Sequence, residues 1–131
     1  IIKCDLETIM NEADIFSFHI PQTTETINLV NDDFINKMKK NALLINTSRG
    51  KIVKTESVVN ALKSKKLCGA CLDVLENENL ESYNNDEKKL YHYLFNTENV
   101  IVTPHIAGWT NEAKYKMALV LFKKFKKIFH N

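Results

Sequence analysis

Residues 42–50 read Ala-Leu-Leu-Ile-Asn-Thr-Ser-Arg-Gly, an apolar run that passes directly into a short polar segment. Such a run with polar residues and glycine at its end is typical of a buried strand followed by a loop. Arg49 is the only arginine among the eighteen basic residues, and its planar fork can grip a carboxylate or phosphate as lysine cannot. Arg49 is therefore either a ligand-binding residue or one more surface charge, and the rest of the chain decides between them.

Length and composition indicate an ordinary globular domain. A chain of 131 residues can build one hydrophobic core, and its 44% hydrophobic and 26% charged residues are typical values. The formal net charge of +2 gives no reason to expect nucleic acid or a membrane as partner. No apolar run approaches the roughly 20 residues of a membrane span.

The three cysteines, an odd number, favour a reducing cytoplasm over a set of disulfides. Cys68 and Cys71 have the C-x-x-C spacing of redox and zinc motifs, but they lie in a run that predicts a strand. Residues three apart on a strand are separated by about 10 Å and point to opposite faces, too far for a disulfide. A zinc site of this type needs four ligands, and only Cys4 remains. We expect no metal site and interpret both cysteines as buried structural residues.

The spacing of apolar residues predicts alternating strands and helices. Strands are expected over residues 14–18, 42–45, 67–73 and 100–102, with Pro104 ending the last one. Helices are expected over residues 6–13, from 31 or 32 to about 40, over 54–65 and 111–129, with a short helix ending at Phe95. Asp5 is the expected cap of the first helix. The alternation predicts an α/β fold with a parallel sheet.

In a parallel sheet all strands end at one edge, and ligands bind beyond that edge. The segments that follow the predicted strands carry versatile side chains: His19-Ile20-Pro21, Thr47-Ser48-Arg49-Gly50, Asp73 to Glu78, and His105-Ile106-Ala107-Gly108. Two histidines, several acids and the lone arginine thus fall on one edge. This clustering favours a binding site over a surface-charge interpretation of Arg49.

A histidine, a carboxylate and an arginine at one edge suit proton transfer beside a bound anion. Histidine gives and takes protons near neutral pH, and a carboxylate on its second ring nitrogen would orient the ring and favour the imidazolium. An arginine fork would hold a substrate carboxylate. These parts suit interconversion of a 2-hydroxy acid and a 2-oxo acid, for which a nicotinamide must carry the hydride because no side chain can.

Three segments resemble the D-isomer-specific 2-hydroxyacid dehydrogenase family, which includes D-lactate, D-glycerate and 3-phosphoglycerate dehydrogenases. They are Asn46-Thr47-Ser48-Arg49-Gly50, then Gly69-Ala70-Cys71-Leu72-Asp73-Val74-Leu75-Glu76-Asn77-Glu78, and Thr103-Pro104-His105-Ile106-Ala107-Gly108. Their order and spacing match, and the resemblance extends from about Cys4 to the last helix. It implies a partial Rossmann-type, doubly wound parallel sheet. Residues 1–131 would be the later part of an NAD-binding domain, with a long amphipathic helix over 111–131 that would return to a substrate domain.

The resemblance also implies roles by position. Arg49 would bind the substrate carboxylate and carbonyl, His105 would be the acid–base, and Glu78 would be its paired carboxylate. Glu78 is preferred to Glu76 because it stands five residues after Asp73. The positions that would line the cofactor groove are Ile20, Pro21, Thr26, Thr47, Ser48, Arg49, Asp73, His105 and Gly108, with Asp73 at the nicotinamide end and His19 a groove residue.

The chain departs from the family because it has no G-x-G-x-x-G loop for the cofactor pyrophosphate; its three glycines are widely separated. It also begins with neither methionine nor a signal peptide. We therefore expect a fragment or split product of an NAD-dependent cytoplasmic oxidoreductase that is homodimeric when full length. It would act on small 2-oxo and 2-hydroxy acids, with neither nucleic acid nor membrane as partner, and the 131-residue chain alone would have negligible activity.

Two other interpretations stay open. The same fold serves in dinucleotide-sensing corepressors, which can retain these residues, and the chain could also be a non-functional remnant. Neither the acid used nor the choice of NAD over NADP follows from these residues. The resemblance implies NAD and allows a phosphorylated substrate such as 3-phosphoglycerate.

The remaining polar and aromatic residues have simpler interpretations. His92 and His130 match no motif and are expected on the surface. Four lysines of the last helix could contact nucleic acid or anionic lipid. The other side of this helix carries an apolar stripe, which favours a helix that packs its apolar side on the core and exposes its lysines to solvent. Trp109 is either an aromatic wall of the site or a packing residue. The lysines are Lys123, Lys124, Lys126 and Lys127, and the stripe is Ala118, Leu121, Phe122, Phe125, Ile128 and Phe129.

Overall fold

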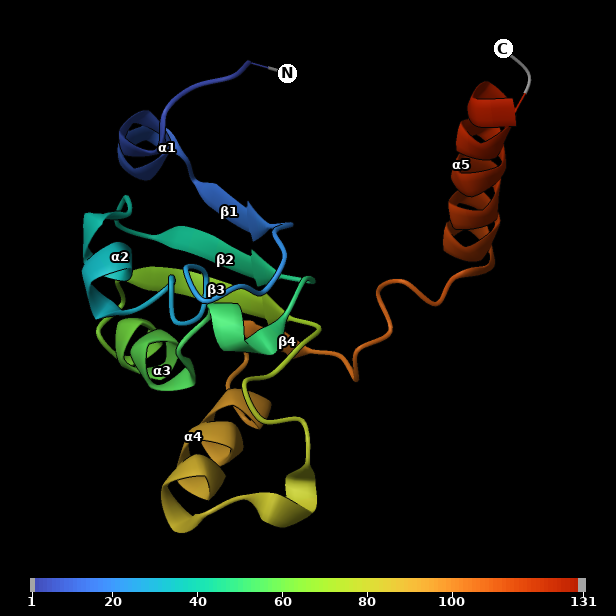
Figure 1. Ribbon diagram of the computed structural model, residues 1–131. Helices are drawn as coiled ribbons and strands as arrows, with labels where there is room; N and C mark the ends of the chain where they lie inside the picture. The colour runs from blue at the N-terminus through green and yellow to red at the C-terminus, as the bar shows by residue number, and fades with distance from the viewer. Residues whose placement is uncertain (1, 130–131) are drawn as a thin grey trace.

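The computed structural model describes residues 2–129 and contains a single four-stranded sheet within that range. The strands are all parallel and follow one another in chain order (Figure 1). They are β1 (Ile15–Phe18), β2 (Ala42–Asn46), β3 (Leu67–Leu72) and β4 (Val100–Val102). The predicted partial Rossmann-type α/β sheet is confirmed.

The five predicted helices are also present, with ends shifted by a few residues. They are α1 (Leu6–Glu12), α2 (Asp32–Lys37), α3 (Thr55–Lys63), α4 (Asn85–Phe95) and α5 (Asn111–Phe129), with short 3₁₀ helices η1 (Gly50–Ile52) and η2 (Leu80–Ser82). Asp5 caps α1 as predicted, because its side chain accepts a hydrogen bond from the Thr8 N–H at 2.8 Å. Helix α2 ends before the predicted Lys40 because the backbone turns extended at Met38, whose side chain is buried.

One face of the sheet carries the hydrophobic core. Strands in chain order with right-handed crossovers bring every crossover helix to the same face. On that face Phe16, Leu44 and Leu72 are at most 5% exposed. They belong to one cluster with Phe34 of α2, Val58 and Leu62 of α3, and Leu94 of α4.

The described helices leave the opposite face of the sheet uncovered. Ile15 on β1 and Ile101 on β4 are 58% and 61% exposed. Cys71 pairs in register with Ile101 and is half-buried on this side. The sequence interpretation placed Cys68 and Cys71 in the core. For Cys71 it was wrong because no described helix covers this face.

All three cysteines are free, and none of them is buried. Besides the half-buried Cys71, Cys68 is exposed and occupies an irregularity of β3, because Ala42 pairs with Leu67 and Leu43 with Gly69. The extra residue of such a bulge has no place in the ladder. Cys4 is exposed ahead of α1.

Helix α5 stands away from the body of the chain, at the end of the segment over residues 103–110 (Figure 1). None of its residues is buried. Its predicted apolar stripe is therefore exposed, with Leu121 and Phe125 at 71% and 55%, which corrects the interpretation of a core contact. The reason is that no described element covers the stripe. In the described part of the chain, no helix combines the length and apolarity needed to cross a membrane.

Candidate active site at the carboxyl edge of the sheet

The loops after the four strands lie side by side along one edge, because all strands are parallel. The first two are joined directly. The Val30 N–H donates to the carbonyl of Ile52, and the Lys54 N–H donates to the carbonyl of Val30, both at 3.0 Å. The predicted site residues are thus carried by a connected row of loops.

The loops after β3 and β4 bring Glu78 and His105 into contact. Nδ1 of His105 lies 3.0 Å from Oε2 of Glu78, and the two side chains are 44% (Glu78) and 48% (His105) exposed. A carboxylate at Nδ1 orients the ring and sets which of its two nitrogens faces a ligand. Nε2 has no hydrogen-bond partner among the described residues, so this nitrogen can exchange a proton with a ligand.

The backbone of His105 has a φ of 54°, in the left-handed region that side-chain-bearing residues seldom adopt. Three N–H groups hold it there by bonding to Asp73. The His105 N–H donates to the Asp73 carbonyl at 2.8 Å, and those of Ile106 and Ala107 donate to the two carboxylate oxygens at 2.9 Å each. One aspartate therefore fixes the conformation that presents the histidine.

Asp73 is itself buried, with 5% exposure, and the Thr103 hydroxyl donates to its carboxylate at 2.6 Å. Burial alone would raise the pKa of Asp73, but the hydrogen bonds from Thr103, Ala107 and Ile106 and the charge of His105 outweigh it, so the pKa is lowered. The sequence suggested only a cofactor contact for Asp73. Its hold on the His105 loop was missed because these partners lie about thirty residues further along the chain.

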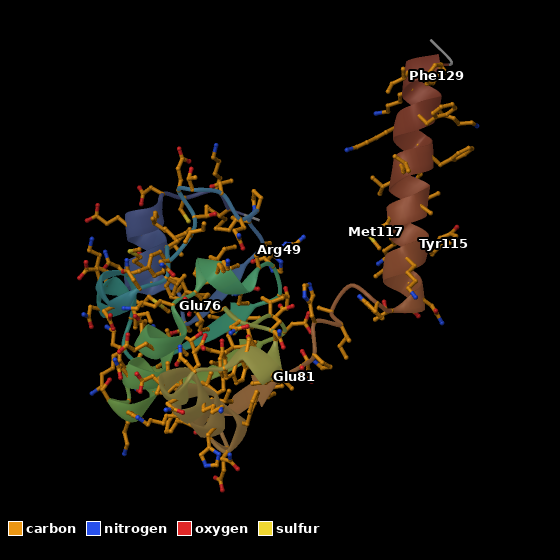
Figure 2. The ribbon with its side chains drawn as sticks, turned by 60° about the horizontal axis from the view of Figure 1, so that its bottom comes forward. Arg49, Glu76, Glu81, Tyr115, Met117 and Phe129 are labelled. Atoms are coloured by element: carbon orange, nitrogen blue, oxygen red, sulfur yellow. The ribbon has the colours of Figure 1, made fainter. Side chains whose placement is uncertain are left out.

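Arg49 lies on the exposed side of its loop and points away from the body (Figure 2). Its Nη1 donates to the Ser48 carbonyl at 2.7 Å. Within the described residues no carboxylate lies within ion-pair distance of the guanidinium. The fork is therefore available to an external anion.

The Arg49 loop is fixed from below by Asn46, which is fully buried. Asn46 Nδ2 donates to the Arg49 carbonyl at 3.0 Å, and Oδ1 accepts from the N–H and hydroxyl of Ser48 at 3.1 and 2.8 Å. Gly50 is buried against the next loop, since a Cβ there would lie 1.8 Å from the Leu75 carbonyl oxygen. The spacing of apolar residues gave no signal for either contact.

The groove residues after β1 lie at the other end of the edge. Three strand spacings separate β1 from β4, which is about 14 Å. The Thr26 hydroxyl donates to the Pro21 carbonyl at 2.8 Å and accepts from the Thr23 N–H at 2.7 Å, which closes this turn. His19 is exposed and bonds to the Ser17 hydroxyl at 2.8 Å. The structure thus brings Asp73, Glu78 and His105 together and leaves Ile20, Pro21 and Thr26 apart from them.

Thr47 and Gly108 are two further groove residues. Thr47 is half-buried, and its hydroxyl has no hydrogen-bond partner among the described residues. Gly108 is exposed, and a Cβ there would meet no atom within 4 Å. Trp109 is 70% exposed, which argues against a packing role within the described body.

The remaining histidines and lysines lie outside this site. His92 is exposed on α4 as predicted, and His130 lies outside the described residues. Lys123, Lys124, Lys126 and Lys127 of α5 are exposed as predicted.

Residues 1–107 match the family model of the D-isomer specific 2-hydroxyacid dehydrogenase NAD-binding domain. Among curated relatives, glyoxylate reductase from Thermofilum pendens is 46% identical, and the match covers 87% of this chain and 31% of the relative. A D-lactate dehydrogenase from Curvularia clavata is 40% identical over 87% of this chain and 34% of its own length. The chain thus spans about a third of the length of these relatives.

The fold has the same relatives among solved structures. The D-lactate dehydrogenase from Aquifex aeolicus, crystallised with NAD and lactic acid, superposes with a TM-score of 0.79 at 33% identity. That match covers 96% of this chain and 41% of the solved one.

Proposed function

The chain belongs to the D-isomer specific 2-hydroxyacid dehydrogenase family, within its NAD-binding domain, and on that premise we propose that it is part of a longer NAD-dependent enzyme that interconverts a D-2-hydroxy acid and a 2-oxo acid. Residues 1–131 would then be a partial NAD-binding domain, with α5 returning to a substrate domain. The observation that carries the proposal is the contact of His105 with Glu78 at the same sheet edge as Arg49, whose guanidinium has no carboxylate partner among the described residues.

The residues present fit the nicotinamide half of the cofactor. The hydroxyl of Thr47, which has no partner in the described part of the chain, and the open space at Gly108 allow a ligand to approach the edge closely. The residues proposed to hold the cofactor are Ile20, Pro21, Thr26, Thr47, Ser48, Arg49, Asp73, His105 and Gly108. When bound, the nicotinamide supplies the hydride. The sequence has no glycine-rich loop to hold the pyrophosphate.

In the proposed mechanism Arg49 binds the substrate. Its fork makes two parallel hydrogen bonds to the carboxylate, which also orients the neighbouring carbonyl carbon. The fixed loop matters here, because Asn46 and Gly50 set the direction from which the guanidinium leaves the backbone.

His105 moves the proton. In the reductive direction Nε2 donates a proton to the substrate oxygen as the hydroxyl forms, and in the oxidative direction it accepts that proton. Glu78 keeps Nδ1 protonated and stabilises the imidazolium, so that the second nitrogen is the one that exchanges.

Arg49→Lys in the longer enzyme tests the clamp. Losing the second hydrogen bond to the carboxylate should lower kcat/KM for the 2-oxo acid on the order of 10- to 100-fold. Lys51→Ala, which removes a neighbouring exposed charge, is the control and should stay near wild type. Near-normal turnover in Arg49→Lys would remove Arg49 from substrate binding.

Glu78→Gln tests the proton relay. Without the carboxylate the His105 ring loses the acceptor that orients it and holds a proton on Nδ1, so kcat for reduction should fall on the order of 100-fold. A kcat equal to that of wild type would mean that Glu78 does not act on His105.

We further propose that the 131-residue chain alone has negligible dehydrogenase activity, because it has no pyrophosphate cradle. A cytoplasmic location, which the three free cysteines favour, and a homodimer are proposed for the longer enzyme. NADH oxidation should be measured with glyoxylate, pyruvate and phosphohydroxypyruvate, for the 131-residue chain and for the longer enzyme. Robust turnover by the 131-residue chain would contradict its proposed inactivity. The acid that the longer enzyme prefers would identify the substrate.

A further inference from the structure

We propose that Glu76 is a positioning residue that fixes the Arg49 loop relative to the Glu78–His105 pair. The inference rests on the proposed function, in which both groups act on one substrate. It concerns the two loops after β2 and β3, which supply the clamp and the carboxylate of the acid–base pair.

The first observation is that Glu76 caps a helix that belongs to the other loop. Its Oε2 accepts a hydrogen bond from the Thr55 N–H, the first residue of α3, at 2.9 Å. The local N-cap residue, Lys54, makes no side-chain cap. Two residues separate the end of η1 from the start of helix α3, and η1 begins next to Arg49. A carboxylate at a helix N-terminus is stabilised by both the free N–H groups and the helix dipole.

A second contact joins the same loops close by. Gly50 packs so closely on Leu75 that no Cβ fits between them. Gly50 follows Arg49, and Leu75 precedes Glu76. Two neighbouring contacts, Gly50 with Leu75 and Thr55 with Glu76, restrict rotation of one loop against the other as well as translation.

The third observation concerns the residue between the two glutamates. The Asn77 N–H donates to the Tyr91 hydroxyl at 3.0 Å, and the Tyr83 hydroxyl donates to the Asn77 carbonyl at 3.1 Å. Tyr91 is 2% exposed and stacks on Tyr83, with ring centroids 4.4 Å apart. Asn77 is thereby held at both its N–H and its carbonyl, so loss of the Glu76 contact would turn this short segment about Asn77 and move Glu78 on its other side.

Glu76 faces α3 and not the histidine, which separates its role from that of Glu78. It lines a cavity of about 490 Å³ together with Lys51, Thr55 and Tyr91. Figure 2 shows Glu76 over the body of the molecule, whereas Arg49 extends from its rim. Glu76 thus acts through other residues and has no contact of its own with the reacting atoms.

NMR spectroscopy of the 131-residue chain, without ligand, tests the proposal. In Glu76→Ala the Thr55 amide should exchange with solvent about tenfold faster, as expected for a lost cap. The His105 ring signals should move toward their positions in Glu78→Gln. In Glu76→Gln the Thr55 exchange rate and the His105 ring signals should both stay near wild type, because the amide oxygen still accepts the hydrogen bond. Glu56→Ala removes a first-turn acid of α3 without touching the cap and should also leave the ring signals unchanged.

Faster Thr55 exchange with unchanged His105 signals would reduce Glu76 to a helix cap and overturn the proposal. Unchanged exchange and unchanged ring signals would overturn it as well. If Glu76→Ala does not fold, Glu76→Asp keeps the charge but is one methylene too short, and it should give the same displacement of the ring signals. Wild-type spectra for Glu76→Asp would then contradict the proposal.

Titration with oxalate separates this inference from the proposed function. Oxalate should shift the Arg49 side-chain signals of wild type, and the Arg49→Lys variant should need on the order of ten times more oxalate, or more, for a comparable response. Absence of any response in wild type would contradict the substrate clamp, while the ligand-free comparison of Glu76 variants would still decide the positioning role.

Discussion

The loops that follow β2 and β4 lie at the same edge of the sheet, but different interactions hold them in place. Around Arg49 the β2 loop is held by uncharged contacts, namely the hydrogen bonds of the fully buried Asn46 and the packing of Gly50 on the backbone of Leu75, and the Glu76 carboxylate contacts it only further along, at Thr55. The β4 loop is exposed from Pro104 onward, and it is held through hydrogen bonds to one carboxylate, that of Asp73.

The difference means that the two loops respond to different perturbations. Close packing depends on volume and hardly on pH, because the atoms in contact are uncharged. A charged tether depends on the ionisation of one group, so acid can release it without any change in volume. The proposed clamp at Arg49 and the proposed acid–base at His105 should therefore be separable experimentally.

Adding one methyl group to the packed loop should have the largest effect. The Cβ of Gly50→Ala would lie 1.8 Å from the Leu75 oxygen and 2.1 Å from its carbon, both backbone atoms that cannot move aside cheaply. We expect the free energy of unfolding of the 131-residue chain to fall by at least about 3 kcal/mol, measured by urea denaturation. A loss below about 1 kcal/mol would mean that the loops are not closely packed.

Removing the charged tether should have the next largest effect. Asp73→Asn keeps the volume but replaces a carboxylate oxygen with an NH₂ group facing backbone N–H donors. We expect a loss of about 2 to 3 kcal/mol in the free energy of unfolding at pH 7. Asp14→Asn is the control, because Asp14 is exposed and forms only a surface ion pair with Lys39.

The same variant tests the pH dependence. Because the pKa of Asp73 is lowered in the folded chain, its stabilisation is present above the unfolded value of about 3.9 and is lost as pH falls through the lower folded value. The difference in stability between wild type and Asp73→Asn should therefore shrink below about pH 4. A constant difference from pH 7 to about pH 3 would contradict the charged tether.

The comparison also shows what the sequence could predict. Strands and helices followed from the spacing of apolar residues, because that spacing reflects burial of one face of each element. The placement of Arg49, Glu78 and His105 at one edge followed from the parallel topology. These predictions required only local patterns and one rule about the ends of strands.

The interpretations that failed depended on which surfaces are covered. Cys71 and the apolar residues of α5 have the composition of core positions, and periodicity indicates that an element has an apolar side without saying what packs on it. The tethering roles of Asn46 and Asp73 were missed for a related reason. Both depend on polar partners whose distance in space is not encoded in spacing along the chain.

Cutting the hydrogen bonds beneath the β2 loop should have a moderate effect. Asn46→Ala leaves the Arg49 carbonyl and the Ser48 N–H without their partner. Because water can reach the exposed side of this loop, we expect a loss of about 1 to 2 kcal/mol in the free energy of unfolding at pH 7. Unlike that of Asp73→Asn, this loss should be the same at about pH 3, and a marked change with pH would weaken the contrast between the loops.

Adding the same methyl group to the exposed loop should have the smallest effect. A Cβ at Gly108 would meet no atom within 4 Å, and φ there is not positive, so alanine meets neither a clash nor backbone strain. We expect Gly108→Ala to change the free energy of unfolding by no more than about 0.5 kcal/mol. Paired with Gly50→Ala, it isolates the contribution of packing, since the two substitutions are chemically identical and differ only in what surrounds the new Cβ. A loss as large as that of Gly50→Ala would show that the β4 loop is packed as tightly as the β2 loop, and the charged tether would then not be its main restraint.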